Sequence, residues 1–318
     1  MSKNNLTLKD IAEEAGVSLT AASLYINGKA RQYNLSESTC DRIKKVIKSH
    51  NFVPNIHARA IASKKTFLVG VVLSQELEAS FWLNIISSLE EELSGANYHL
   101  LLSVSHGRKE SERDSIDFMR SKGIDGLIIS PIETGGLEDL SRELPIVTLN
   151  LGIENVPGVW NDNFHGGRLA TDYLLDNGHR RIAAIGSVGI QRAIAYCDRL
   201  NQSQITPHIF PSVKDFMLQA DQFTAVFCFN DYLMLELYQA TAAAGIDIPN
   251  DLSVIGYDNM DFVKFLSPRP STIAQYKNEL GSAAGQLILQ LIDGKRDVNR
   301  QIVFTPKLIS GKSVKKMT

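Results

Sequence analysis

Two different spacings of apolar residues divide the chain. Over the first fifty residues, apolar side chains recur every three or four positions, as at Leu8, Ile11, Ala12 and Ala15, which is the spacing of one face of an amphipathic helix. From Phe67 onward, short continuous apolar runs alternate with amphipathic stretches. The pattern therefore predicts a small helical N-terminal region followed by a larger α/β body.

Two short helices joined by a tight turn are predicted between Thr7 and Gly28. Thr7 can cap the first helix, and Asp10 follows it at the spacing of a capping box. Gly16 suits the left-handed conformation that ends a helix, and Ser18 can cap a second helix. This order is typical of the helix-turn-helix, which lays its second helix in the major groove of DNA. The alternative is a small helical hairpin that packs against another part of the protein.

The charge distribution favours the DNA-binding alternative. A third amphipathic helix is predicted from Glu37 to Asn51, with Ser36 as its cap and its lysines and arginine facing outward. Residues 1–66 contain eleven Lys and Arg and five Asp and Glu, a net charge of +6, whereas residues 67–318 contain 22 and 30, a net charge of −8. A basic head on an acidic body is the electrostatic pattern expected of a protein that binds phosphates.

Nine ordered motifs resemble the lactose-repressor (LacI/GalR) family of bacterial transcription regulators. They are TLKDIAEEAGVS, SLYING, FVPNIHARAI, GIDGLIIS, DNFHGGRLA, GHRRIAAIG, FNDYLM, IPNDLSVIGYDN and PSTIAQ, which follow the family's order over nearly the whole chain. The resemblance implies an N-terminal three-helix helix-turn-helix head and a hinge helix, followed by a two-lobed periplasmic-binding-protein-like α/β body. The implied divisions are a head at 1–52, a hinge helix or linker at 53–66 and a body at 67–318, with lobe 1 near 67–161 and 277–300, lobe 2 near 162–276 and a C-terminal strand at 301–313.

By this resemblance, Leu19 and Thr20 face the base edges. A leucine can contact only apolar groups such as a thymine methyl, whereas a threonine can also form a hydrogen bond. The family's usual Thr-Val-Ser-Arg is Ala21-Ala22-Ser23-Leu24 here, so a guanine-binding arginine is missing and the operator sequence cannot be carried over. Ser18, Ser23, Tyr25 and Asn27 either contact phosphates or serve as caps and core residues. The full set assigned to DNA contact is Thr7, Ser18, Leu19, Thr20, Ser23, Leu24, Asn27, Asn55, Ala58, Arg59 and Ile61.

The hinge helix matches the family at Asn55 to Ser63. In the family, two such helices meet in the minor groove, and a bulky apolar residue from each wedges into a base step. Ile61 occupies that position here, where leucine is usual. Unstacking a base step costs about a few kcal/mol, which the contacts of the bent DNA offset. The alternative is a plain linker helix with Ile61 packed on the body.

The body carries seven apolar runs, which are expected to be strands. They are 67–73, 98–105, 126–130, 145–150, 181–186, 225–230 and 253–258. Such runs alternating with helices predict parallel sheets covered on both faces, and ligands bind beyond the carboxyl ends of parallel strands. The polar or aromatic candidates after the runs are Ser74, Ser80-Phe81-Trp82, His106, Asp162-Asn163, Arg192, Asn230-Asp231 and Asp258-Asn259.

These side chains suit a sugar, because carboxylates, amides and arginine pair with vicinal hydroxyls and an aromatic face covers the apolar side of the ring. The resemblance places effector contacts at Phe81, Trp82, Arg192, Asn230, Asp231 and Asp258, with His165 beside them. Each has a structural alternative. Trp82 can be a core residue, Asp231 can cap the helix that follows it, and Asp258 can simply end a strand.

Two departures from the family bear on the effector. Arg192 and Asn230 are 38 positions apart, which is shorter than usual, so lobe 2 is expected to be smaller, with a strand at Ile205–Phe210 and a trimmed helix at Val213–Ala220. Gly311 stands where the family has an arginine near the last strand. Either change points to a different ligand or to a regulator that needs none.

Other classes of protein are disfavoured. The chain has no G-x-S-x-G, Walker-type, G-x-G-x-x-G or H-E-x-x-H motif, and its seven His and three Cys show no metal-ligand spacing, so neither an enzyme nor a cofactor is expected. No apolar run approaches the length of a membrane span. The N-terminus lacks the apolar core of a signal peptide, which argues against an exported solute-binding protein and favours the cytoplasm.

The sequence therefore predicts a cytoplasmic transcription regulator, most simply a repressor. It would act as a homodimer on a pseudo-palindromic double-stranded DNA operator, with a carbohydrate effector between two lobes. The alternative is a ligand-independent regulator with a degenerate pocket.

Overall fold

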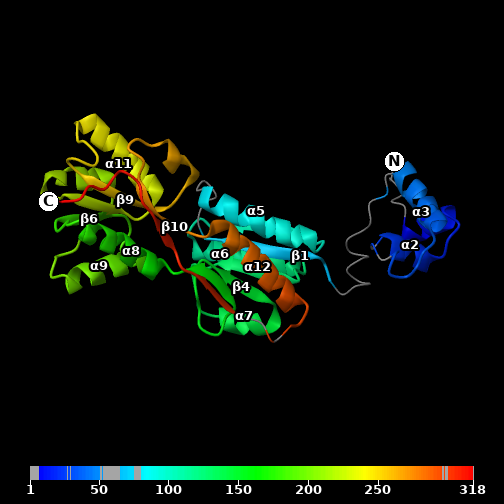
Figure 1. Ribbon diagram of the computed structural model, residues 1–318. Coiled ribbons are helices and arrows are strands. Elements are labelled where there is room, and N and C mark those ends of the chain that lie inside the picture. Colours follow the sequence, from blue (N-terminus) through cyan, green and yellow to red (C-terminus); the bar gives the residue numbers. More distant parts are fainter. Residues whose placement is uncertain are drawn as a thin grey trace. The chain divides into compact units, whose positions relative to one another are not determined.

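The computed structural model describes residues 7–26, 28, 30–50, 52, 65–74, 80–295, 297 and 300–317. The chain divides into two units, Met1–Phe67 and Leu68–Thr318, referred to below as the head and the body. The head contains the helices α1, α2 and α3, and Figure 1 shows that the body consists of two sheets with helices packed against them.

The head begins with the predicted helix-turn-helix. Its helices are α1 (Leu8–Glu14), α2 (Leu19–Ile26) and α3 (Glu37–Ser49). The capping box of α1 is present, since Thr7 Oγ1 accepts from the Asp10 amide at 3.3 Å and Asp10 Oδ2 accepts from the Thr7 amide at 2.7 Å. Gly16 adopts the left-handed conformation, with φ +62°, and Ser18 Oγ accepts from the Ala21 amide at 3.1 Å. These four local predictions are confirmed.

A small apolar core holds the three helices of the head together. Ile11 of α1 and Ala15, the C-cap of that helix, pack against Ile43 and Val46 of α3, and all four are buried. The spacing that predicted the inward faces of these helices is confirmed, and the core fixes how α2 is presented.

Lobe 1 of the body is built on an all-parallel sheet with strand order β11-β5-β4-β3-β1-β2. Its strands are β1 (Leu68–Leu73), β2 (His99–Val104), β3 (Gly126–Ser130), β4 (Ile146–Leu149), β5 (Gly158–Asn161) and β11 (Gln301–Phe304). Its helices are α5 (Ser80–Gly95), α6 (Lys109–Ser121), α7 (Leu137–Glu143) and α12 (Lys277–Ile292).

Lobe 2 repeats this plan with strand order β12-β10-β9-β8-β6-β7. Its strands are β6 (Ile182–Ile185), β7 (His208–Phe210), β8 (Ala225–Cys228), β9 (Ser253–Asp258), β10 (Ser271–Ala274) and β12 (Lys307–Ile309), of which only β12 pairs antiparallel. Its helices are α8 (Asn163–Asp176), α9 (Gln191–Gln202), α10 (Val213–Met217) and α11 (Asp231–Ala244), with 3₁₀ turns at η1 (Ala220–Gln222) and η2 (Asp261–Phe265).

All seven predicted apolar runs contain strands. In the shortened part of lobe 2 the expected strand is narrower than predicted, because β7 starts at His208, and the expected helix becomes α10 followed by η1. The segment expected to form one strand, 301–313, instead forms β11 and β12 in different sheets. The chain crosses from lobe 1 to lobe 2 between Phe304 and Lys307, and this crossing divides the expected strand into two.

Helix α12 is packed closely on α5, which makes it part of lobe 1. A Cβ atom on Gly281 would lie 2.2 Å from the Ile85 carbonyl oxygen, and one on Gly285 would lie 2.7 Å from Glu92 Cβ. Glycine at these two positions therefore allows the close approach of the helices. Both lie on the same face of α12, four residues apart.

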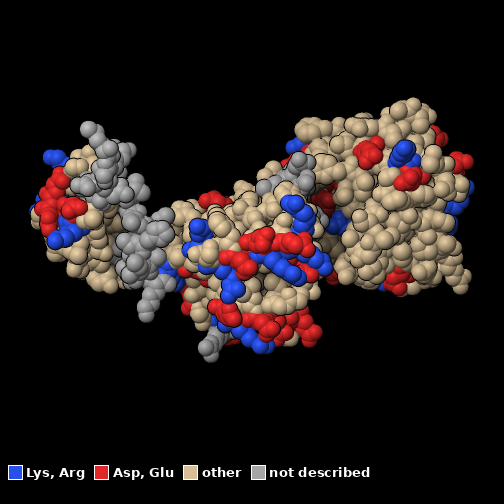
Figure 2. Space-filling view, turned by 180° about the vertical axis from the view of Figure 1, so that it is seen from behind, with Lys and Arg blue, Asp and Glu red and all other residues tan. Residues whose placement is uncertain are grey.

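Surface charges on the body are mixed. On the face seen in Figure 2, Lys and Arg lie among Asp and Glu. Ion pairs in lobe 1 join Arg113 to Glu133 at 2.6 Å and Arg120 to Glu143 at 3.0 Å. Interspersed signs do not produce the single-sign field that attracts DNA. Among the described residues, no helix has the length and apolar character needed to span a membrane.

Candidate effector site and DNA-reading helix

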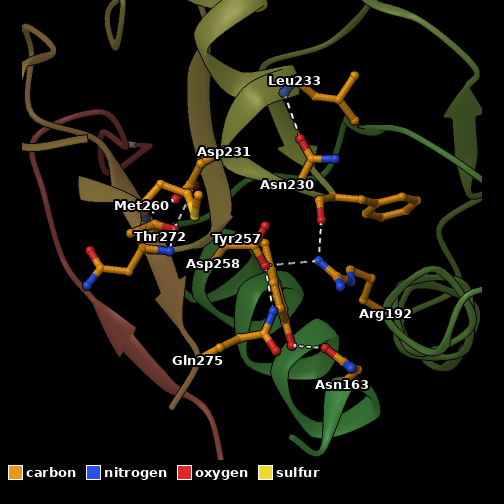
Figure 3. A network of polar contacts seen from close by, with 12 residues as sticks. Asn163, Arg192, Asn230, Asp231, Leu233, Tyr257, Asp258, Met260, Thr272 and Gln275 are labelled. Carbon is orange, nitrogen blue, oxygen red and sulfur yellow. Dashed lines mark hydrogen bonds and ion pairs between the residues drawn. The ribbon is translucent and has the colours of Figure 1, made fainter. Parts of the chain in front are cut away.

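Polar side chains from four elements of lobe 2 converge where its parallel strands end. Figure 3 shows Arg192 from the start of α9, Asn230 before α11, Asp258 at the end of β9 and Gln275 after β10. The carboxyl ends of parallel strands meet at one edge of the sheet, so residues far apart in sequence are brought together.

Arg192 lies at the centre of this group. Its Nη1 donates to the Phe229 carbonyl oxygen at 2.5 Å and lies 3.5 Å from Asp258 Oδ1. Its guanidinium carbon is 4.1 Å from the ring centroid of Tyr257, a cation–π distance. The Tyr257 hydroxyl in turn donates to Asn163 Oδ1 at 3.0 Å. The arginine is thereby held in one orientation by a carbonyl, a carboxylate and a ring.

Asp258 is a buried carboxylate that accepts hydrogen bonds from two side chains. Besides Arg192, Gln275 Nε2 donates to its Oδ1 at 2.5 Å. Burial raises the pKa of Asp258, and the nearby Arg192 charge opposes that shift. Its backbone has φ +105° and that of Asn259 has φ +47°, conformations that cost residues with a Cβ about 1–3 kcal/mol each.

Asp231 braces the turn after β9 from inside lobe 2. It is fully buried, and its two oxygens accept from the Met260 amide and from Thr272 Oγ1, each at 2.8 Å. Burial raises the pKa of Asp231 to about 7, and the Asp258 charge acts in the same direction. Both oxygens of this carboxylate are thus occupied within the protein.

Asn230 is the N-cap of α11, because its Oδ1 accepts from the Leu233 amide at 2.8 Å. The alternative that Asp231 caps this helix is therefore wrong, because the cap is Asn230, one residue earlier. Asp162 caps α8 in the same way, accepting from the His165 amide at 2.8 Å. His165 itself is half-buried on the first turn of α8.

Phe81 and Trp82 come from α5 in lobe 1. Both are buried, Trp82 with 2% of its surface exposed, and their ring centroids are 5.3 Å apart in an edge-to-face arrangement. Trp82 therefore has the burial expected of a core residue. Ser74 follows β1 and Ser130 ends β3, so both lie at the carboxyl edge of the lobe 1 sheet, where their Oγ atoms are 3.3 Å apart.

Three residues that contact Arg192 or Asp258 lack a clear sequence signal, and one of them is Lys277 of α12, whose ammonium donates to the Asp258 carbonyl oxygen at 2.9 Å. Tyr257 lies inside an apolar run, and its position in a strand predicted only burial. Gln275 and Lys277 follow β10, whose short Ser-Thr-Ile-Ala strand mixes polar and apolar residues and does not stand out as a run. The motif PSTIAQ covers β10 and Gln275 but assigns no role to that glutamine, and the carboxyl end of β10 points to a site only once the strand is known.

In the head, the first turn of α2 is open to solvent. Leu19 is 52% exposed and Thr20 is exposed beside it, while Ala22 is fully buried and Ser23 and Leu24 are half-buried. Thr7 and Ser18 are helix caps. The other assigned DNA contacts lie outside the described residues, and they are Asn27, Asn55, Ala58, Arg59 and Ile61.

Comparison with known proteins gives the family. Residues 7–55 match the bacterial regulatory proteins of the lacI family, and residues 171–314 match the periplasmic binding protein-like domain. The repressor PurR of Vibrio cholerae is 31% identical over 98% of this chain and 99% of that protein. The chain belongs to the LacI family. PurR of Histophilus somni is 32% identical over 97% of this chain and 99% of its own length.

Solved structures share the fold of this LacI-family chain. The lac repressor dimer bound to operator and the anti-inducer ONPF matches with a TM-score of 0.84 at 22% identity, over 98% of this chain and all of that one. A LacI-family regulator from Enterococcus faecium with bound ribose matches with a TM-score of 0.69 at 25% identity, over 79% of this chain and all of that one. The fold is a helix-turn-helix head followed by a two-sheet periplasmic-binding-protein-like body, as predicted. The PurR relatives are transcriptional repressors of the helix-turn-helix type. Among the described residues, no group of His, Cys, Asp and Glu is arranged to hold a metal ion.

Proposed function

We propose that this chain is a sequence-specific transcriptional repressor whose operator affinity depends on a small molecule, most simply a sugar, bound between the two lobes. The observation that carries the DNA-binding part is the exposed first turn of α2, with Leu19 and Thr20 presented by a buried three-helix core. The N-terminal residues of a recognition helix are those that meet base edges.

The effector part rests on the polar group at the strand ends of lobe 2. Arg192 offers further N–H donors beyond the one bonded to Phe229, and Asp258 offers a second carboxylate oxygen. A donor fork beside an acceptor matches a pair of neighbouring hydroxyls. Structures of the same fold are known with bound ribose and as a cellobiose complex, which supports a sugar as the ligand class.

The regulator would act as a homodimer in the cytoplasm, with two heads on a pseudo-palindromic operator and the hinge segments, 53–66, at its centre. The lac repressor neighbour is described as a dimer bound to operator, which supports this assembly. Ligand binding would shift the lobes and change how the two hinge segments pair. Coupling of this kind is typically worth about 1–3 kcal/mol per site.

A second candidate is a regulator that responds to no ligand. It is favoured by the hydrogen bonds that the candidate residues make with one another and with the backbone. Arg192 is bonded to Phe229 and Asp258, and Asp258 is bonded to Gln275. In this case the body would serve dimerisation only.

Selection of bound sequences from a random duplex pool tests both candidates. The full chain would be used at one fixed salt concentration, because phosphate contacts make affinity fall steeply with salt. Parallel selections would contain no sugar, ribose, xylulose or cellobiose. A palindromic consensus whose recovery changes with one sugar supports the repressor with an effector. A consensus unaffected by any sugar favours the ligand-independent regulator, and no consensus contradicts the assignment of the head.

A further inference from the structure

Lys277 is a residue of lobe 1 that reaches into the turn carrying Asp258. It is the first residue of α12, and its ammonium donates to the carbonyl oxygens of Asp258 and Asn259, each at 2.9 Å. Both carbonyls belong to lobe 2, at the end of β9. The contact therefore joins the start of a lobe 1 helix to the backbone of a candidate effector residue.

The turn that Lys277 contacts needs support from its surroundings. Asp258 and Asn259 have φ +105° and +47°, which L-residues rarely adopt unless neighbouring groups hold them there. From lobe 2, the turn is held by Asp231, which accepts from the Met260 amide, and by Thr272 Oγ1, which accepts from the Asn259 amide at 3.3 Å. Among the described residues, Lys277 is the side chain of α12 that bonds to this turn.

Lys277 will follow any movement of lobe 1, because α12 is fixed to α5. The two helices approach closely at Gly281 and Gly285, with the backbone of Ile85 against Gly281, so we expect α12 to move together with α5. The side chain of Lys277 is half-buried. Burial lowers its pKa, and the nearby charges of Asp258, Asp231 and Asp261 oppose that shift. Through its two charge-assisted hydrogen bonds, the ammonium links the position of α12 to the position of the turn at Asp258 and Asn259.

We propose that Lys277 is a positioning residue that couples the position of lobe 1 to the geometry of the Asp258 carboxylate. A lobe movement that carries Lys277 away from the turn releases the backbone of Asp258 and alters its contact with Arg192. In the reverse direction, a ligand that fixes Asp258 favours the lobe arrangement in which Lys277 is bonded. The regulatory meaning of this coupling rests on the proposed function, but the coupling itself does not require a known ligand.

Hydrogen exchange of the full chain without ligand tests the contact with the turn. Lys277→Met removes the ammonium and keeps most of the stem. We expect exchange of the Met260 amide to become at least about tenfold faster, because two charge-assisted hydrogen bonds to the turn are lost. Lys277→Arg, which keeps two donors, should stay near the wild-type rate. The matched control is Lys307→Met. The Lys307 ammonium lies 5.6 Å from the ring centroid of Tyr276, the residue before Lys277, and makes its contact with that ring and not with the turn. Unchanged exchange in Lys277→Met overturns the proposal.

The distance between the lobes tests the coupling, which a purely local role would not change. Spin labels would be placed on exposed residues of α5 and α11, Glu91→Cys and Gln239→Cys, after replacement of Cys40 and Cys197. We expect a broader distance distribution in Lys277→Met than in the wild type, Lys277→Arg or Lys307→Met. Faster exchange with an unchanged distribution would show a local brace and contradict the coupling.

A second substitution tests the role of the turn independently of how well Lys277→Met folds. Asn259→Gly removes the conformational cost of a positive φ, so it should reduce the effect of Lys277→Met on both readouts even if that variant alone folds poorly. No reduction in the double variant would contradict the role of the turn. Failure of the sugar selections leaves both readouts intact, so the two hypotheses fail separately.

Discussion

The guanidinium carbon of Arg192 lies 4.1 Å from the ring centroid of Tyr257. The pair joins α9 to β9, and the Tyr257 hydroxyl extends the connection to Asn163 on α8. An arginine stacked on a ring and bonded to a backbone carbonyl has already lost much of its conformational freedom, so a ligand would meet a preorganised donor.

Replacement of Arg192 should separate ligand response from DNA binding. In Arg192→Met we expect the same operator consensus as in the wild type but a loss of the sugar response. The reason is that one hydrogen bond to a charged group is worth about 1.5–3 kcal/mol, which is about 10- to 150-fold in affinity. Operator binding would be followed by fluorescence anisotropy with and without the sugar found in the selection.

The control for this experiment is Arg168→Met, because Arg168 is an exposed residue of α8 that forms an i,i+4 ion pair with Asp172. It should respond like the wild type. A full sugar response in Arg192→Met would remove Arg192 from the effector site.

The buried carboxyl of Asp231 should make the body less stable as the pH rises. Its pKa in the folded protein is raised to about 7 from an ordinary value of 3.8. Between these values the unfolded chain has released the proton and the folded chain has kept it. The free energy of unfolding therefore falls with rising pH from about 4 to about 7, by up to about 1.4 kcal/mol per pH unit, and this contribution is constant above pH 7.

Urea unfolding followed by tryptophan fluorescence measures this effect in the body, because both tryptophans, Trp82 and Trp160, lie there. Asp231→Asn cannot ionise and should show a smaller slope over the same range. Asp176→Asn, at an exposed position of α8, should keep the wild-type slope. Equal slopes in the wild type and Asp231→Asn would show that Asp231 does not titrate in this range.

The fold and the site differ in how much of them the sequence predicts. Apolar periodicity and local capping chemistry are properties of neighbouring residues, so α1, α2, α3 and the seven strands could be predicted from the sequence. The direction of a side chain within a motif depends on contacts far away. Asp231 follows a strand, as a ligand-binding residue would, yet its oxygens are occupied by Met260 and Thr272, from a turn and a strand later in the chain.

Close packing of α12 on α5 is another feature that sequence reasoning could not supply. Gly281 sits in a helical pattern, where a glycine is usually only a weak point. The need for glycine at position 281 is visible only in the structure, where the backbone of Ile85, nearly two hundred residues earlier, lies against it. The contact of Lys277 could not be predicted either, because its two acceptors, 19 and 18 residues earlier, are backbone carbonyls that carry no residue-type signal.

A methyl group at Gly281 should destabilise the body. The Cβ would lie 2.2 Å from a backbone oxygen, so α12 and α5 must separate, and overpacking of this kind costs about 1–3 kcal/mol. The matched control is Gly95→Ala at the end of α5, where a Cβ has no atom within 4 Å and alanine should be neutral or slightly stabilising. Urea unfolding by tryptophan fluorescence compares the two. Equal stability of both variants would contradict the close packing on which the proposed role of Lys277 depends.

Thr20 should determine part of the operator sequence. It is exposed on the first turn of α2, and a threonine there can both bond to a base edge and touch a thymine methyl. In Thr20→Ala we expect the consensus from random-pool selection to change at one position in each half-site, by about 1–3 kcal/mol of discrimination. Lys44→Ala, on the exposed face of α3, should instead weaken all sequences about equally and lower the salt dependence, as expected for a phosphate contact. An unchanged consensus in Thr20→Ala would show that this threonine does not read bases, and the specificity would then have to come from Leu19 and other parts of the head.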